Sequence, residues 1–179
     1  MFLKNYFLIL LIFLSSNIPM AQDKFSNFKK YPKTNQKFKL VKVTEKLNYP
    51  WGMTFIDKEH LLVTEKNGRL LKINIKTGLK KEIKHEIQSI KFKNEKKIST
   101  QQGGLLDVLY DNGWVYFSYS HTFEKNNLDD RSSGRFSSTA IARGILKDDK
   151  ILNLKVLFIA KPKLISGKHF GSRMVIKDE

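Results

Sequence analysis

Histidine is the side chain in this sequence best suited to acid–base chemistry, because imidazole titrates near neutral pH. Three of the four histidines, His60, His85 and His121, stand in a polar turn, in a lysine-rich segment and at the head of a polar insertion. The fourth, His169, directly precedes a short apolar run that is typical of a strand. We therefore take His169 as the candidate catalytic residue. The structural alternative is a histidine that only satisfies a hydrogen bond at the start of a strand.

Other common catalytic patterns are missing from the sequence. The chain has no cysteine, which excludes disulfides, thiolate metal sites and a cysteine nucleophile. No pair of histidines has the spacing of a metal motif, and HExxH, Walker, GxSxG and GxGxxG motifs are absent. The sequence therefore predicts no metal ligands, and a redox reaction would need a cofactor, since no side chain accepts hydride.

The sequence predicts short strands separated by turns as the elements that position His169. Asn67-Gly68 between two β-like runs is a strong hairpin signal. The isoleucines at 83, 87 and 90 have helix-like spacing, but their place in the chain favours an outer strand or a linker. The expected strands are Gly52–Ile56, Leu61–Glu65, Arg69–Ile75, Gly104–Tyr110, Trp114–Ser120, Thr139–Leu146, Ile151–Phe158 and Gly171–Ile176.

The strands recur as a unit. Opening strands begin at Gly52, Gly104 and Gly171, at intervals of 52 and 67 residues, and the polar loop His121–Ser138 accounts for the longer interval. A repeat of about fifty residues with three or four short strands is typical of the blades of a β-propeller. A β-sandwich is the alternative, since it also uses short strands at regular spacing.

This repeat brings distant residues to equivalent positions. In a propeller the innermost strands line a central channel, so residues just before them lie at one mouth of it. The segments 49–51, 101–103 and 168–170 occupy this place. Gln102 and His169 are therefore expected to converge on one rim, where glycines allow the backbone to approach a flat ligand.

The charge of the chain is high but broadly distributed. Lys and Arg number 33 against 17 Asp and Glu, a formal charge of +16, yet only five of the cations are arginines. Recognition of bases and tight binding of phosphates favour arginine, whose planar guanidinium forms two parallel hydrogen bonds. The densest lysine stretch, 79–100, also contains glutamates. We therefore expect no nucleic-acid partner, although the positive field favours acidic partners.

The first residues have the pattern of a signal peptide. Lys4 precedes the apolar run Phe7–Leu14, and a small residue, Ala21, offers a cleavage site. The run is too short to span a bilayer, so no stable membrane span is expected after cleavage. We predict a signal peptide over 1–21, a linker over 22–39 and propeller blades over 40–179, in a protein that is exported, either periplasmic or secreted.

Several landmarks in fixed order resemble a known family. They are the runs 47–55 (LNYPWGMTF), 62–70 (LVTEKNGRL), 102–108 (QGGLLDV), 139–144 (TAIARG) and 166–173 (SGKHFGSR). Together they resemble the soluble glucose/sorbosone dehydrogenases, which are aldose sugar dehydrogenases dependent on pyrroloquinoline quinone (PQQ). The resemblance extends from about residue 40 to Glu179.

The resemblance implies a six-bladed propeller with PQQ at the channel mouth. It implies oxidation of the C1 hydroxyl of an aldose to a lactone, with hydride transfer to PQQ and re-oxidation by an external electron acceptor. His169 matches the family's general base beside the cofactor, and Gln102 matches a residue that hydrogen-bonds PQQ. Calcium is expected as a Lewis acid on the quinone. Lys168 stands where relatives often have glycine or asparagine.

The family pattern continues for several more blades. Its remaining PQQ contacts and its calcium ligands lie beyond Glu179 in relatives, so we expect an N-terminal part of a dehydrogenase, with about two blades and one strand, that is inactive alone. An open propeller also leaves unpaired strand edges. The alternative function is a non-catalytic exported propeller that binds glycans or proteins, which would have no need for Gln102 and His169 on one rim.

Overall fold

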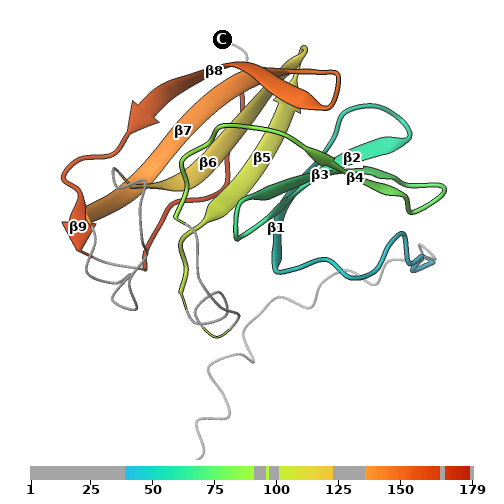
Figure 1. The fold of residues 1–179 in the computed structure, drawn as a ribbon, viewed down its shortest axis with the longest axis horizontal. Coiled ribbons are helices and arrows are strands. Elements are labelled where there is room, and N and C mark those ends of the chain that lie inside the picture. The colour runs from blue at the N-terminus through green and yellow to red at the C-terminus, as the bar shows by residue number, and fades with distance from the viewer. Residues whose placement is uncertain (1–38, 91–95, 97–100, 123–135, 166–167, 178–179) are drawn as a thin grey trace, which may run out of the picture. The chain divides into compact units, whose positions relative to one another are not determined.

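In the described part of the chain the strands form two antiparallel sheets (Figure 1). The residues that this computed structural model describes are 39–90, 96, 101–122, 136–165 and 168–177. The strands are β1 (Pro50–Phe55), β2 (His60–Glu65), β3 (Arg69–Asn74), β4 (Lys80–Ile83), β5 (Leu105–Asp111), β6 (Trp114–Thr122), β7 (Phe136–Lys147), β8 (Lys150–Ile159) and β9 (Leu164–Ile165). They belong to one compact unit, Val41–Glu179. The predicted signal peptide (1–21), and the linker as far as residue 38, lie outside the described residues.

Each sheet is a meander. The strand orders are β1-β2-β3-β4 and β5-β6-β7-β8, with β9 paired to the start of β7. Neighbours in each sheet therefore follow sequence order, as in propeller blades, whereas a Greek-key sandwich would interleave them. The propeller prediction is confirmed, and the sandwich alternative is wrong.

Two hairpins have two-residue turns in which both residues have positive φ. Asn112 and Gly113, between β5 and β6, both have positive φ, 46° and 85°. Asp148 and Asp149, between β7 and β8, also have positive φ, 47° and 57°. Positive φ at both central residues is the type I′ geometry, whose twist matches that of the flanking strands. The predicted Asn67-Gly68 hairpin is confirmed as well, with β2 and β3 paired from Glu65↔Arg69 onward.

The core lies between the two sheets. Its buried side chains come from both, including Leu62, Leu70, Phe117, Val115 and Ala140. The isoleucine segment behaves as expected of an outer strand and linker: Ile83 ends β4, and Ile87 and Ile90 are buried beyond it. Apolar burial of this kind is the main stabilising contribution in such a domain.

The opening strands of the two sheets are neighbours. The Tyr110 amide in β5 donates to Thr54 Oγ1 in β1 at 3.3 Å. Gly52 lies so close to β5 that an added Cβ would be 2.7 Å from Asp107 Oδ1. β1 and β5 are each the first strand of their sheet, as expected for inner strands of consecutive blades.

The third expected strand, Gly171–Ile176, is not a strand. Its backbone bonds go to side chains: the Gly171 amide donates to Thr139 Oγ1 at 2.9 Å, and Ser118 Oγ donates to the Ser172 carbonyl at 2.6 Å. Within the described residues no strand pairs with it through backbone hydrogen bonds, and a strand requires such a partner. The segment nonetheless lies next to both opening strands, because Trp51 Nε1 of β1 donates to Ser172 Oγ at 2.7 Å and the Met174 amide donates to Asp107 of β5 at 2.9 Å.

The expected polar loop His121–Ser138 is shorter than predicted. β6 continues to Thr122 and β7 begins at Phe136, with His121 paired to Ser138 and Thr122 to Ser137. Polar side chains at these positions hid the strand continuation, since β-propensity depends on context. Residues 123–135 lie outside the described part of the chain.

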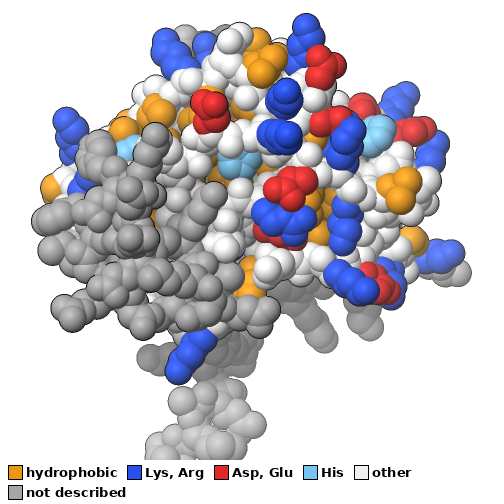
Figure 2. Space-filling view, in the orientation of Figure 1, with side chains coloured by type: hydrophobic (Ala, Val, Ile, Leu, Met, Phe, Trp, Pro, Cys, Tyr) orange, Lys and Arg blue, Asp and Glu red, His pale blue; other side chains and the backbone are white. Residues whose placement is uncertain are grey.

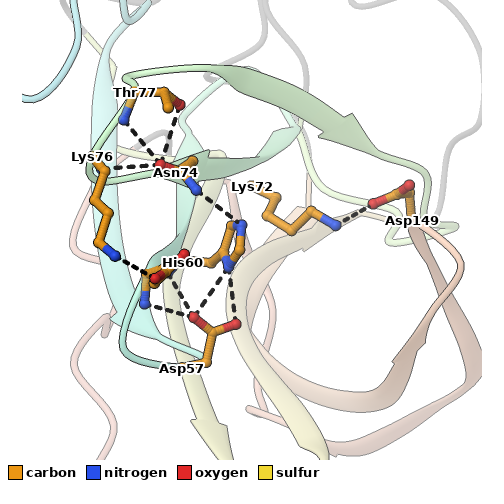
Figure 3. Close-up of polar contacts among 8 residues, drawn as sticks. Asp57, His60, Lys72, Asn74, Lys76, Thr77 and Asp149 are labelled. Carbon is orange, nitrogen blue, oxygen red and sulfur yellow. Dashed lines mark hydrogen bonds and ion pairs between the residues drawn. The ribbon is translucent and has the colours of Figure 1, made fainter.

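Polar contacts connect the outer ends of the two sheets (Figure 3). Asp149, in the β7–β8 turn, pairs with Lys72 of β3 and with Lys81 of β4. The Lys84 amide donates to the Asp149 carbonyl at 3.0 Å, and the Ile151 amide donates to the Lys84 carbonyl at 2.8 Å. The turn is therefore held against the end of the first sheet by main-chain and side-chain bonds together.

The surface charge is mixed. Figure 2 shows Lys and Arg side chains spread over the visible face, with Asp and Glu side chains among them. This distribution agrees with the broad charge expected from the sequence.

Candidate functional site

Gln102 and His169 meet, as the repeat predicts. The backbone amide of His169 donates to Oε1 of Gln102 at 2.7 Å across 67 residues of sequence. Both side chains are exposed. His169 has a φ of 64°, in the left-handed region that residues with a side chain seldom adopt.

Two glycines make this approach possible. Gly104 has a φ of 133°, and an added Cβ there would lie 2.1 Å from the Lys66 carbonyl oxygen. An added Cβ on Gly103 would lie 3.1 Å from Cε2 of Phe170, the neighbour of His169. The Gly103-Gly104 pair therefore lets β5 begin against the first sheet while Phe170 packs beside it.

The chain after His169 is held by a buried carboxylate. Asp107, in β5, accepts a bond from the Met174 amide at 2.9 Å and another from Arg173 Nη1 at 3.2 Å. Its side chain is only 5% exposed, whereas that of Arg173 is 78% exposed. Arg173 is therefore a surface residue that forms an ion pair with a buried carboxylate. Asp107 was missed, although a carboxylate between buried leucine and valine in a strand is a usable signal.

The first rim segment, 49–51, lies at the same place. Trp51 bonds Ser172, and the Lys66 ammonium lies 5.6 Å from the centroid of the Trp51 ring. Lys66 Nζ also donates to the Gln101 carbonyl. Burial lowers the pKa of the Lys66 side chain. Lys66 thus links the first and second rim segments, and sequence analysis missed it because lysines are so frequent in this chain.

The other three histidines lie elsewhere. His60 Nδ1 contacts Asp57 at 3.0 Å in the β1–β2 turn (Figure 3), and His85 Nε2 bonds the Gly68 carbonyl at 3.0 Å. His121 Nδ1 lies 3.0 Å from Lys163 Nζ. Burial, and secondly the charge of Lys163, lower the pKa of His121. These contacts fit structural roles, in contrast to His169.

The rim has features that suit a flat, negatively charged cofactor. Gln102 uses Oε1 on the His169 amide, so its Nε2 is the group left to donate. The Trp51 ring supplies an aromatic surface, and Lys66 supplies a cation beside it. Such a site combines apolar surface with a few placed polar groups. Within the described ranges, no three His, Asp or Glu side chains are grouped so that they could hold a metal ion.

Comparison with known proteins identifies similar sequences and folds. Residues 47–179 match the profile of the family described as Glucose / Sorbosone dehydrogenase. The chain is 31% identical over 140 residues to aldose sugar dehydrogenase YliI of Escherichia coli, a match that covers 73% of this chain and 33% of that protein. A crystal structure of a glucose dehydrogenase is 31% identical with a TM-score of 0.59, covering 74% of this chain and 36% of that one.

A more distant structure has the same fold. It is the PQQ-bound form of an aldose sugar dehydrogenase from Streptomyces coelicolor, 20% identical with a TM-score of 0.50, covering 70% of this chain and 34% of that one. The chain therefore spans about a third of the length of the proteins it matches.

Proposed function

Since the chain belongs to the glucose/sorbosone dehydrogenase family, we propose that it forms part of the active-site rim of a PQQ-dependent aldose dehydrogenase. The observation that carries this proposal is the bond between His169 and Gln102 at the start of the second blade. A propeller without this activity has no chemical need to join these two residues.

His169 is the proposed general base. Its exposed side chain can accept the proton of the C1 hydroxyl of an aldose, and imidazole does so near neutral pH. Loss of that proton allows C1 to become the carbonyl carbon of a lactone as its hydride leaves. PQQ, when bound, supplies the acceptor for this hydride.

Gln102 is the proposed cofactor contact. Its Oε1 is engaged by the His169 amide, so the bond to PQQ would come from Nε2. His169 and Trp51 are further candidates to contact PQQ, since both have exposed side chains at the rim. A neutral hydrogen bond of this kind contributes about 0.5–1.5 kcal/mol.

Calcium, the electron acceptor and the location are proposed from the family resemblance. The described residues hold no group of three His, Asp or Glu side chains placed to bind a metal ion, and we propose that other residues of the protein hold the calcium. We propose export to the periplasm or the medium, and an external acceptor that re-oxidises the quinone. The described residues include no helix long and apolar enough to cross a membrane.

PQQ titration tests the proposal. The longest natural polypeptide that contains this chain should bind PQQ saturably, seen as a change in its absorbance, and should reduce a dye when an aldose is added. The same polypeptide without PQQ is the control. A folded protein that binds glycans but neither binds PQQ nor reduces the dye would support the non-catalytic alternative instead.

A further inference from the structure

A pocket adjoins His169 on the side of the second sheet. Its volume is about 210 Å³. It is lined by 137–139 at the start of β7, by Ala160, Pro162 and Leu164 after β8, and by 168–170. The residue proposed to act on C1 of a sugar is therefore itself part of the wall, so a sugar placed at His169 has this pocket beside it.

The lining combines polar and apolar groups. Thr139 Oγ1 accepts a bond from the Gly171 amide, which leaves its hydroxyl hydrogen to donate elsewhere. Pro162, Leu164 and Phe170 supply apolar surface. Lys168 adds an exposed ammonium next to His169. A monosaccharide, with polar edges and apolar ring faces, matches such a lining.

The chain around the pocket carries one sign of charge. From Lys150 to Lys177, both included, the sequence contains seven Lys and Arg residues and no Asp or Glu. Lys161, Lys163 and Lys168 all lie in the stretch 160–170, which supplies six of the nine lining residues. A concave site surrounded by positive charge raises the local concentration of anionic ligands.

We propose that this pocket binds the charged substituent of an anionic aldose, a sugar carboxylate or a sugar phosphate, and that Lys168 recognises the anion. This inference rests on the proposed function and adds a substrate class to it. Lys168 is the specificity-determining residue because, of the pocket's lining residues, it carries the permanent positive charge and adjoins the proposed base. Recognition by one ammonium applies equally to a carboxylate and to a phosphate.

Isothermal titration of the longest natural polypeptide containing this chain tests the proposal. The probes are glucose, glucuronate, glucose 6-phosphate and inorganic phosphate. At least one anionic aldose should bind about tenfold or more tightly than glucose, the ratio expected for a hydrogen bond to a charged group. Lys168→Gln should abolish this preference, and Lys168→Glu should reverse it.

Lys155→Gln is the matched control, since it removes the same charge from an exposed position on β8 outside the pocket. It should keep the preference, and thermal unfolding should show both variants folded. The proposal would be overturned if glucose bound as tightly as the anionic aldoses, or if Lys168→Gln and Lys155→Gln lost the preference equally. It would also be overturned if inorganic phosphate bound as tightly as glucose 6-phosphate. PQQ binding is measured separately. A parent protein that binds PQQ but does not prefer anionic aldoses rejects only the subsite. A parent protein that prefers anionic aldoses but does not bind PQQ rejects only the proposed dehydrogenase function.

Discussion

The amide of His169 is bonded to Oε1 of Gln102 at 2.7 Å, while His169 itself adopts a φ of 64°. A residue with a side chain is held in that region only where its surroundings compensate the strain. The Gln102 carbonyl is one such compensating group. Gln102 is therefore expected to act both as a cofactor contact and as a positioning residue for the proposed base.

Two substitutions of Gln102 separate these roles. Gln102→Glu keeps an acceptor for the His169 amide but removes the amide donor, so PQQ affinity should fall while turnover at saturating PQQ stays close to the parent's. Gln102→Ala removes both groups and should lower affinity by about 0.5–1.5 kcal/mol and turnover as well. Steady-state kinetics over a PQQ titration measure both quantities. Parent-like turnover in Gln102→Ala would show that the bond does not position His169.

Replacement of the proposed base should affect turnover most. His169→Gln retains hydrogen-bonding capacity but cannot take up the proton, so kcat should fall by roughly 10²–10⁴-fold. PQQ affinity should change much less. His60→Gln is the matched control, because His60 bonds Asp57 in a distant turn, and its turnover should match the parent's. Near-normal turnover in His169→Gln, at saturating PQQ and calcium, would return His169 to a structural role.

The sequence predicted features that depend on local chemistry or on the repeat. Asn67-Gly68 forms the turn between β2 and β3 because glycine tolerates positive φ, which is 95° at Gly68. Gln102 and His169 meet because equivalent positions of a repeated unit share one rim. Neither conclusion required knowledge of particular side-chain contacts.

The predictions that failed depend on long-range partners. Gly171–Ile176 has the composition of a strand, but Asp107, Ser118 and Thr139 bind its backbone in place of a neighbouring strand. Asp107 itself was missed because an aspartate in a strand says nothing by itself about which distant amide it accepts from. Such contacts follow from tertiary packing, which periodicity does not encode.

Asp107 should matter more for stability than its ionic partner. Asp107→Asn removes the charge that two donors share in a buried place, so unfolding free energy should fall by about 1.5–3 kcal/mol. Arg173→Gln should cost less, because its exposed guanidinium is well solvated. Urea unfolding gives the ranking, and hydrogen exchange of the Met174 amide should accelerate in Asp107→Asn. Equal costs, or unchanged exchange, would contradict this role of Asp107.

His121 should make stability depend on pH. Burial and the nearby Lys163 charge lower the pKa of His121 in the folded state, so the unfolded chain takes up its proton first. The stabilisation is complete above the ordinary histidine pKa of about 6.5 and is lost as pH falls below it. His121→Gln should flatten urea-unfolding stability between pH 7 and pH 5 (roughly the range over which histidine titrates), and an unchanged slope would refute the assignment.

The surface of β1 predicts how the chain behaves when it is produced alone. Trp51, Met53 and Phe55 alternate on one face of this edge strand and are 40%, 64% and 58% exposed. Apolar side chains gathered along an unpaired strand edge favour association with another sheet. Residues 22–179 should therefore self-associate as concentration rises, measured by sedimentation velocity, and should show no PQQ-dependent dye reduction with aldoses.

Substitutions on this face of β1 distinguish association through β1 from association through any exposed apolar side chain. Met53→Lys with Phe55→Lys places charge on the exposed face without touching the buried side of β1, so association should weaken. Leu79→Lys is the control, because Leu79 is 72% exposed in a turn away from this strand, and it should leave association unchanged. The prediction would be contradicted if residues 22–179 stayed monomeric at all concentrations, unfolded cooperatively and reduced the dye in the presence of PQQ and an aldose.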